Sequence, residues 1–187
     1  MDEELTALSK VKENAKSSIA VLGGAKISTK LSLIDSLSKR VDKVILGGGI
    51  ANTCLAAKGY EVGKSLIEDS MLEEAKELVA NPKIIIPESV IVSISADEPG
   101  RITSANSIKE NEAIFDIAPA SFVELEPIIM NAGTILWNGP IGFFEKENFF
   151  AGTAMIAKMI ISSKGFSVAG GGDTISCLLY TSPSPRD

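Results

Sequence analysis

Four short apolar runs in this sequence each end in a glycine-rich turn. The turns are VLGGAK at residues 21–26, ILGGGIANT at 45–53, LWNGPIG at 136–142 and VAGGGDT at 168–174. Glycine loses more backbone freedom on folding than any other residue, so a glycine run directly after a strand needs a local reason. An unusual φ angle, or a close approach of another group to the backbone, would provide one.

In the segments between these runs, apolar residues recur at the spacing of a helix. We expect helices over 27–40, 50–59 (closed by Gly59), 65–80, 121–133 and 148–165, and a weak amphipathic helix over 1–16. The expected strands are 17–24, 41–49, 133–142, 166–172 and a β-rich stretch over 83–95 that Pro87 divides. Residues 96–114 are polar and are predicted to form a loop.

The strands are continuously apolar rather than alternating, which is typical of strands buried on both faces of a parallel sheet. Strands that alternate with helices along the chain indicate an α/β fold, with helices covering both faces of a mostly parallel sheet. The last strand, FSVAGGG, is expected to be buried like the others. A length of 187 residues and a hydrophobic content of 45% suit one domain with a sizeable core.

Composition excludes several function classes. The net charge of −6 argues against a nucleic-acid partner, and the lack of histidine excludes imidazole bases and His-ligated metals. No apolar run approaches the length of a membrane span, and the acidic N-terminus lacks the apolar core of a signal peptide. Cys54 and Cys177 have no metal-ligand spacing, so we expect reduced thiols and a cytoplasmic protein.

In a parallel sheet all four turns lie at the carboxyl edge, where open α/β sheets bind their ligands. The helix that follows each turn presents unpaired N–H donors and partial positive charge, which favours an anion, usually phosphate. Asp173 cannot itself attract phosphate, so Mg²⁺ is the expected mediator. Lys26 and Lys30 oppose the dipole of the helix they begin, and a bound anion would balance them.

Each feature alone also has an ordinary structural explanation. One Gly-Gly pair after a strand is usually a turn, and a lone Asp173 is more often a helix N-cap than a metal ligand. The P-loop is absent, because GYEVGKS at 59–65 has three residues between its glycines instead of four. GGGIAN and GGGDTI lack the third small residue of the dinucleotide motif G-x-G-x-x-G. Four glycine turns in one domain still favour a nucleotide or phosphate site.

The stretches LGGAKIS-K, GGGIANT, GKSL, WNGPIGFFE and AGGGDT, in this order, resemble the C-terminal domain of phosphoglycerate kinases. The resemblance covers roughly residues 17–176. It implies a Rossmann-like three-layer sandwich that binds Mg-ADP or Mg-ATP. It also implies reversible phosphoryl transfer between 1,3-bisphosphoglycerate and ADP in glycolysis, a reaction in which positioning and charge stabilisation dominate.

Residue roles follow from the same resemblance. Lys26 and Lys30, with the turn of Gly171 and Gly172, would face the transferring phosphate as the catalytic groups, and Asp173 would bind Mg²⁺. Gly47, Gly48, Gly49 and Leu66 would contact the base, Asn138 the phosphates and Glu145 the ribose. The full nucleotide-binding set expected is Gly24, Ala25, Lys26, Lys30, Gly47, Gly48, Gly49, Leu66, Asn138, Pro140, Glu145, Gly171, Gly172, Asp173 and Thr174.

Residues 1–176 are expected to form this domain in incomplete form, and 177–187, rich in Ser and Pro, a non-native or disordered tail. The family's N-terminal domain, which would bind 3-phosphoglycerate or 1,3-bisphosphoglycerate, has no counterpart here, so we expect no turnover by the chain alone. A monomer is expected. The alternatives are a dinucleotide-binding oxidoreductase domain and a fragment without function.

Overall fold

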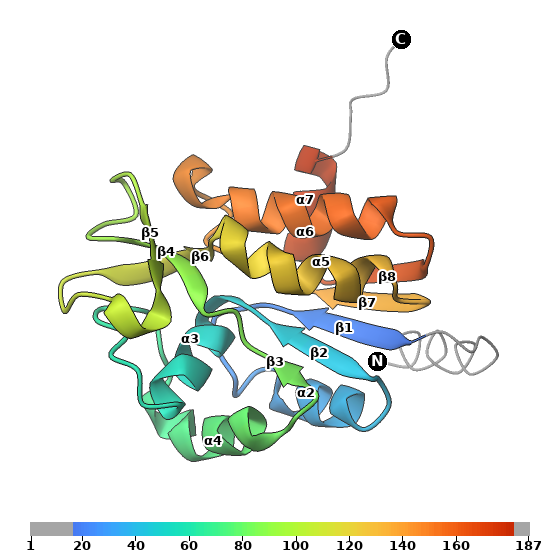
Figure 1. Cartoon of the computed structure of the whole chain (residues 1–187), viewed down its shortest axis with the longest axis horizontal. Coiled ribbons are helices and arrows are strands. Elements are labelled where there is room, and N and C mark those ends of the chain that lie inside the picture. The colour runs from blue at the N-terminus through green and yellow to red at the C-terminus, as the bar shows by residue number, and fades with distance from the viewer. Residues whose placement is uncertain (1–16, 182–187) are drawn as a thin grey trace, which may run out of the picture.

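The protein is described by a computed structural model that covers residues 17–181. The helix expected over 1–16 therefore lies outside the described residues. The main sheet has the strand order β3-β2-β1-β7-β8, and every neighbouring pair in it is parallel (Figure 1). Its strands are β1 (Ser18–Leu22), β2 (Lys43–Leu46), β3 (Ile84–Ile85), β7 (Thr134–Asn138) and β8 (Phe166–Gly170).

Helices cover both faces of this sheet, which confirms the predicted α/β three-layer architecture (Figure 1). Successive residues of a strand point to opposite faces. Ile19 and Val21 of β1 accordingly belong to one apolar cluster, and Ala20 and Leu22 to another. The first cluster includes residues of α5 (Phe122–Met130), α6 (Ala151–Ser162) and α7 (Gly172–Thr181), and the second residues of α2 (Leu31–Ser38), α3 (Gly48–Ala57) and α4 (Leu72–Ala80).

A small antiparallel sheet with the order β5-β4-β6 lies beside the main one. It consists of β4 (Ser89–Ser93), β5 (Arg101–Ser104) and β6 (Ala113–Ile117), so the prediction of a loop over 96–114 is wrong. β5 is almost wholly exposed and carries no apolar pattern. A bidentate ion pair orders this stretch, because Nε and Nη2 of Arg101 donate to the two carboxylate oxygens of Glu112 at 2.6 Å each. Pro87 does divide the strands, and β3 and β4 belong to different sheets.

Helix boundaries differ from the expected ones where tertiary hydrogen bonds hold the backbone. The helix expected from residue 65 begins at Leu72, because Asn52 and Thr53 of α3 bind the backbone of Leu66 and Glu68. α3 already begins at Gly48, within the glycine run, and Gly59 follows its end with a φ of +92° as predicted. The described residues also form short 3₁₀ helices, namely η2 (Asp69–Met71), η3 (Ala105–Ser107), η4 (Pro119–Ser121) and η5 (Glu147–Phe149).

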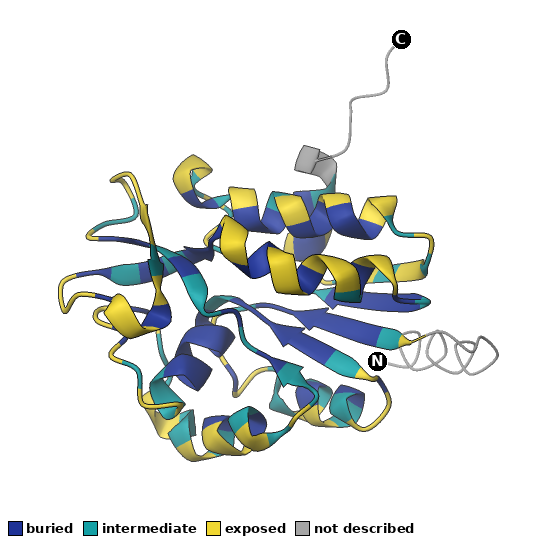
Figure 2. Ribbon diagram, in the orientation of Figure 1, coloured by how far each residue is buried: buried dark blue, intermediate teal, exposed yellow. Residues whose placement is uncertain are grey.

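The last strand is not buried, contrary to the expectation. Among the described residues β8 pairs with β7 alone and forms the edge of the sheet, and its ribbon has no buried residue (Figure 2). Phe166 is 60% exposed. α7 continues past the expected boundary at residue 176 and ends at Thr181, and Cys177 lies in the core. Residues 177–181 of the expected tail are therefore helical, and 182–187 lie outside the described residues.

Candidate functional site

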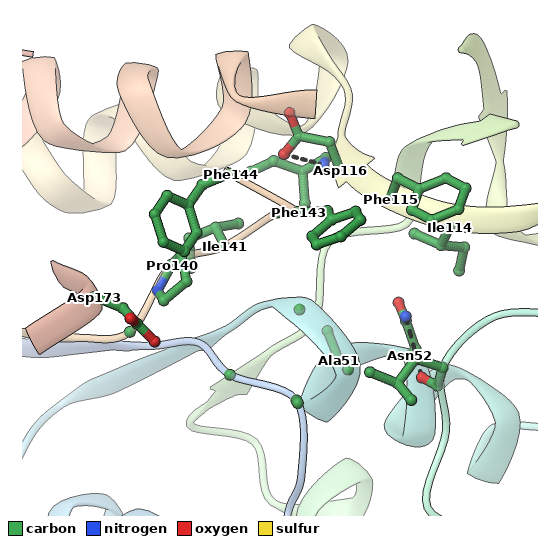
Figure 3. Close-up of a pocket in the computed structure, with 18 of the residues that line it drawn as sticks. Ala51, Asn52, Ile114, Phe115, Asp116, Pro140, Ile141, Phe143, Phe144 and Asp173 are labelled. Atoms are coloured by element: carbon green, nitrogen blue, oxygen red, sulfur yellow. Dashed lines mark hydrogen bonds between the residues drawn. The ribbon is translucent and has the colours of Figure 1, made fainter. Parts of the chain in front are cut away.

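The carboxyl ends of the main-sheet strands open onto one pocket of about 810 Å³ (Figure 3). All four glycine-rich turns contribute to it, so the predicted convergence is confirmed. Gly47 alone of the expected site residues lies behind the pocket wall, where its N–H donates to the carbonyl of Leu22. The expected residues that do line the pocket are Gly24, Ala25, Lys26, Lys30, Gly48, Gly49, Leu66, Asn138, Pro140, Glu145, Gly171, Gly172, Asp173 and Thr174.

Glycine occurs in these turns for two different structural reasons. Gly48 has a φ of +65°, and a Cβ on Gly49 would lie 2.2 Å from the carbonyl oxygen of Ala25. These two residues must be glycine because the turns after β1 and β2 pack directly on each other. A Cβ on Gly172 would meet no atom within 4 Å. The backbone at the start of α7 is therefore open to a ligand, as expected for an anion site at a helix N-terminus.

Lys30 joins two of the turns. Its ammonium donates to the carbonyl of Gly23 at 2.6 Å, to the carbonyl of Asn138 at 3.2 Å and to Oδ1 of Asn138 at 2.7 Å. The side chain is partly buried, whereas Lys26 is exposed at the pocket. The two lysines thus have different surroundings: Lys30 bridges the ends of β1 and β7, and Lys26 presents its charge to the open pocket.

Buried threonines hold the turns on the other side of the pocket. The Thr174 hydroxyl accepts a hydrogen bond from the Gly139 N–H at 2.6 Å, which ties α7 to the turn after β7. The Thr153 hydroxyl of α6 lies 3.2 Å from the N–H groups of both Ile141 and Gly142. Because Thr174 is fully buried, its side chain supports the turn, and its predicted contact with phosphate would come from the backbone.

The segment after Leu66 supports the turn that carries the lysines. A carboxylate oxygen of Glu68 accepts the Ser28 N–H at 3.0 Å, and the other accepts the Ser28 hydroxyl. These hydrogen bonds lower the pKa of the Glu68 carboxyl, because they favour its charged form. The Glu68 N–H donates in turn to the Thr53 hydroxyl at 3.1 Å. α3 thereby positions Leu66 and the turn of Lys26 and Lys30 together.

Asp116 is a pocket residue to which the sequence analysis assigned no role. It is 2% exposed, and burial raises the pKa of its carboxyl to about 7. Its oxygens accept the N–H groups of Gly152 at 2.8 Å and Ile117 at 2.9 Å, which partly offset that shift. The side chain lies at the beginning of α6, where a carboxylate complements the helix dipole. A polar residue within an otherwise apolar strand, FDI, was the available signal.

The end of the pocket away from Asp173 is apolar (Figure 3). Phe115 stacks on Phe149 with ring centroids 4.7 Å apart, and on Phe143 at 6.0 Å. The sequence analysis identified Leu66 from this end and missed the others, of which Ile114 and Phe115 belong to β6, a strand that it did not predict. The apolar residues of this end are Leu55, Leu66, Val90, Ile114, Phe115 and Phe143.

No group of three His, Cys, Asp or Glu side chains suited to a metal ion occurs in residues 17–181. Asp173 is an exposed carboxylate of the pocket, which Asp116 and Glu145 also line. That arrangement fits Mg²⁺, which proteins commonly bind through one or two carboxylates together with the phosphates of a ligand. It does not fit a metal held by protein groups alone.

The fold and the pocket define a parallel α/β protein with a ligand site at the carboxyl edge of its sheet. The family model of phosphoglycerate kinase matches residues 1–182, so the chain belongs to the phosphoglycerate kinase family, a family of phosphotransferases. No helix in the part of the chain described is long and apolar enough to cross a membrane.

Two phosphoglycerate kinases are among the solved structures similar to this chain. Phosphoglycerate kinase from Coxiella burnetii is 41% identical with a TM-score of 0.89, and the match covers 96% of this chain and 49% of that one. Phosphoglycerate kinase from Pyrococcus horikoshii OT3 is 30% identical with a TM-score of 0.80, covering 97% of this chain and 48% of that one. The chain thus spans about half the length of these relatives.

Proposed function

We propose that this chain is the nucleotide-binding part of a phosphoglycerate kinase and binds Mg-ADP or Mg-ATP in the pocket. The observation that carries the proposal is the convergence of four turns on one pocket whose two ends differ in character. Asp173 and the open backbone of Gly172 lie at the polar end, and Lys26 is a further charged residue of the pocket lining. Leu66 and Phe115 lie at the apolar end, which suits a base.

The residues at the polar end have separate tasks. The N–H groups at the start of α7 would bind phosphate oxygens, a role that helix N-termini perform through their dipole and unpaired donors. Lys26 would neutralise the developing charge of the transferring group, and Lys30 would hold the turn of Asn138 in place beside it. Glu145, an exposed residue of the pocket lining, would accept the ribose hydroxyls.

Asp173 would hold Mg²⁺ together with the phosphates of the nucleotide. Bound there, the metal would neutralise charge on the phosphate oxygens. The protein's own part is to exclude water at the apolar end and to keep the lysines and the α7 N-terminus aligned, which is most of what phosphoryl transfer requires.

The whole reaction we propose is reversible phosphoryl transfer between 1,3-bisphosphoglycerate and ADP. The chain covers about half of the similar kinases. We therefore assign the phosphoglycerate site to the remaining half and expect no turnover by this chain alone. The buried thiols of Cys54 and Cys177, with pKa values raised by burial to about 12 and about 11, suit the cytoplasmic location that we predict.

Calorimetric titration of the 187-residue chain with Mg-ADP tests the proposal, with NAD as the competing ligand. We expect saturable ADP binding and no response to NAD. Asp173→Ala should weaken Mg-ADP binding more than metal-free ADP binding, whereas Asp35→Ala, an exposed helical aspartate outside the pocket, should change neither. Equal loss with and without Mg²⁺ would show that Asp173 only stabilises the first turn of α7, in which it lies. NAD binding without ADP binding would favour an oxidoreductase domain.

A further inference from the structure

One polar side chain lies among the apolar residues at the far end of the pocket. Asn52 of α3 is 5% exposed and lines the pocket with Leu55, Ile114 and Phe115. Figure 3 shows it beside Ile114, at the end opposite Asp173. The nucleotide-binding roles proposed above leave its function unassigned.

A hydrogen bond orients the amide of this residue. Its Nδ2 donates to the carbonyl of Leu66 at 3.2 Å, and the opposite orientation would place two acceptor oxygens against each other. Oδ1 accepts no hydrogen bond from any described residue. Every fully buried side-chain N or O atom in the described part of the chain has a hydrogen-bond partner. Oδ1 has none, so it is not fully buried, and we infer that it faces the pocket that Asn52 lines.

An acceptor in apolar surroundings favours a ligand that brings an N–H donor to it, because an unpaired polar atom in such a place is costly. We propose that Asn52 determines base specificity and selects a purine with an amino group at position 6, whose N–H donates to Oδ1. The inference rests on the proposed nucleotide site and extends it from the phosphates to the base. A keto oxygen at that position would place an acceptor against Oδ1.

The same amide also fixes the backbone of Leu66, whose side chain is 57% exposed at the pocket. Packing of the base on Leu66 and recognition of its amino group therefore depend on one residue. The two effects are separable, since packing acts on any purine and the hydrogen bond acts only on a purine that carries the donor.

The test compares ADP with purine riboside 5′-diphosphate, which lacks the 6-amino group and is otherwise the same. Calorimetric titration of the 187-residue chain with Mg²⁺ present should show ADP binding about three- to tenfold more tightly, the usual effect of one neutral hydrogen bond. Inosine 5′-diphosphate, with a keto oxygen at position 6, should bind more weakly than ADP. If the unmodified chain bound ADP and purine riboside 5′-diphosphate with equal affinity, the inference would be wrong.

The variant Asn52→Leu then tests whether this side chain causes the preference for ADP over the analogue. The ratio of the two affinities should fall to about one, while any loss of Leu66 positioning lowers both affinities equally. Asn131→Leu is the matched control, since that exposed amide also donates to a backbone carbonyl, of Pro127, and lies outside the pocket. An unchanged ratio in Asn52→Leu would contradict the inference. If neither diphosphate binds the unmodified chain, the proposed function itself is wrong.

Discussion

The strands β1 and β8 both place a short apolar run before a glycine-rich turn, and both turns line the same pocket. β1 lies between β2 and β7, and four of its five residues are buried. β8 lies at the edge of the sheet in the described residues and has no fully buried residue. One sequence pattern thus forms both the central strand of the core and an exposed edge.

This difference extends to the layers around the two strands. On the β1 side, the turns after β1 and β2 pack backbone to backbone, as the contact between Gly49 and Ala25 shows. On the β8 side, the start of α7 is open, and the neighbouring turn depends on the side chains of Thr153 and Thr174. The pocket therefore has one wall in which turns pack backbone to backbone and another that is open at the start of α7, beside a turn that buried threonines support.

Truncation of one large apolar residue in each strand should give the largest contrast. Ile19→Ala in β1 removes a side chain that is 1% exposed, and we expect it to lower the free energy of unfolding by about 2–5 kcal/mol. Phe166→Ala in β8 should lower it by about 0.5 kcal/mol or less, as at an exposed site. Urea denaturation of both variants measures the two values. Similar losses would show that β8 is buried in solution.

The two sides of the pocket should also differ in how their titratable groups change the stability of the protein with pH. Asp116, next to α6, has a pKa of about 7, so between pH 4 and 7 the folded protein keeps a proton that the unfolded chain loses. Stability should therefore fall as pH rises through this window and level off above pH 7, by at most about 4 kcal/mol. On the β1 side the Cys54 thiol, with a pKa of about 12, stays neutral throughout.

Asp116→Asn should flatten this pH dependence, because the amide does not titrate. The measurement is the difference in free energy of unfolding between pH 5 and pH 8, since the substitution also changes the hydrogen bonds to Gly152 and Ile117 at every pH. Asp35→Asn, at an exposed position on α2, should keep the slope of the unmodified chain. A slope unchanged by Asp116→Asn would mean that this carboxyl is ionised in the folded state.

A smaller contrast is expected between glycines of the two walls. Gly49→Ala places a Cβ against the backbone of Ala25 and should cost about 1–3 kcal/mol of stability, as overpacking usually does. Gly172→Ala meets open space at the beginning of α7 and should leave stability unchanged or slightly raised, since alanine favours helix. Thermal unfolding compares the two, and equal losses would contradict the packing difference.

The smallest contrast concerns the hydrogen bonds that hold the turns. Thr174→Val leaves the buried N–H of Gly139 without its acceptor and should cost about 1–2 kcal/mol. Glu68→Gln weakens hydrogen bonds to Ser28 that are exposed to solvent, so its midpoint of thermal unfolding should shift less. Thermal unfolding of both variants measures the two shifts. A larger shift for Glu68→Gln than for Thr174→Val would mean that the solvent-exposed hydrogen bonds of Glu68 contribute more to the stability of the pocket.

The sequence predicted much of the pocket lining because its signals are local. Each strand and its glycine turn are contiguous, and the carboxyl ends of parallel strands necessarily meet at one edge. Fourteen of the fifteen expected residues accordingly line one pocket. Gly47 was the exception, since only the packing of Ile141 against it shows that it lies behind the wall. The strand β5 was missed because its pairing with β4 and the Arg101–Glu112 ion pair order it, rather than an apolar pattern. The strand β6 was missed because its short apolar run at 113–117 begins inside the stretch predicted as a loop.

By itself the sequence determined the α/β class, the family and the turns that form the pocket, since all of these depend on contiguous patterns and motifs. The tertiary structure decided which strand lies at the edge, because burial depends on how many neighbours a strand has in the sheet. It also decided the pKa of Asp116 and the orientation of Asn52, because groups distant in the sequence set both. Environment and direction of a side chain are properties of packing, and no local pattern records them.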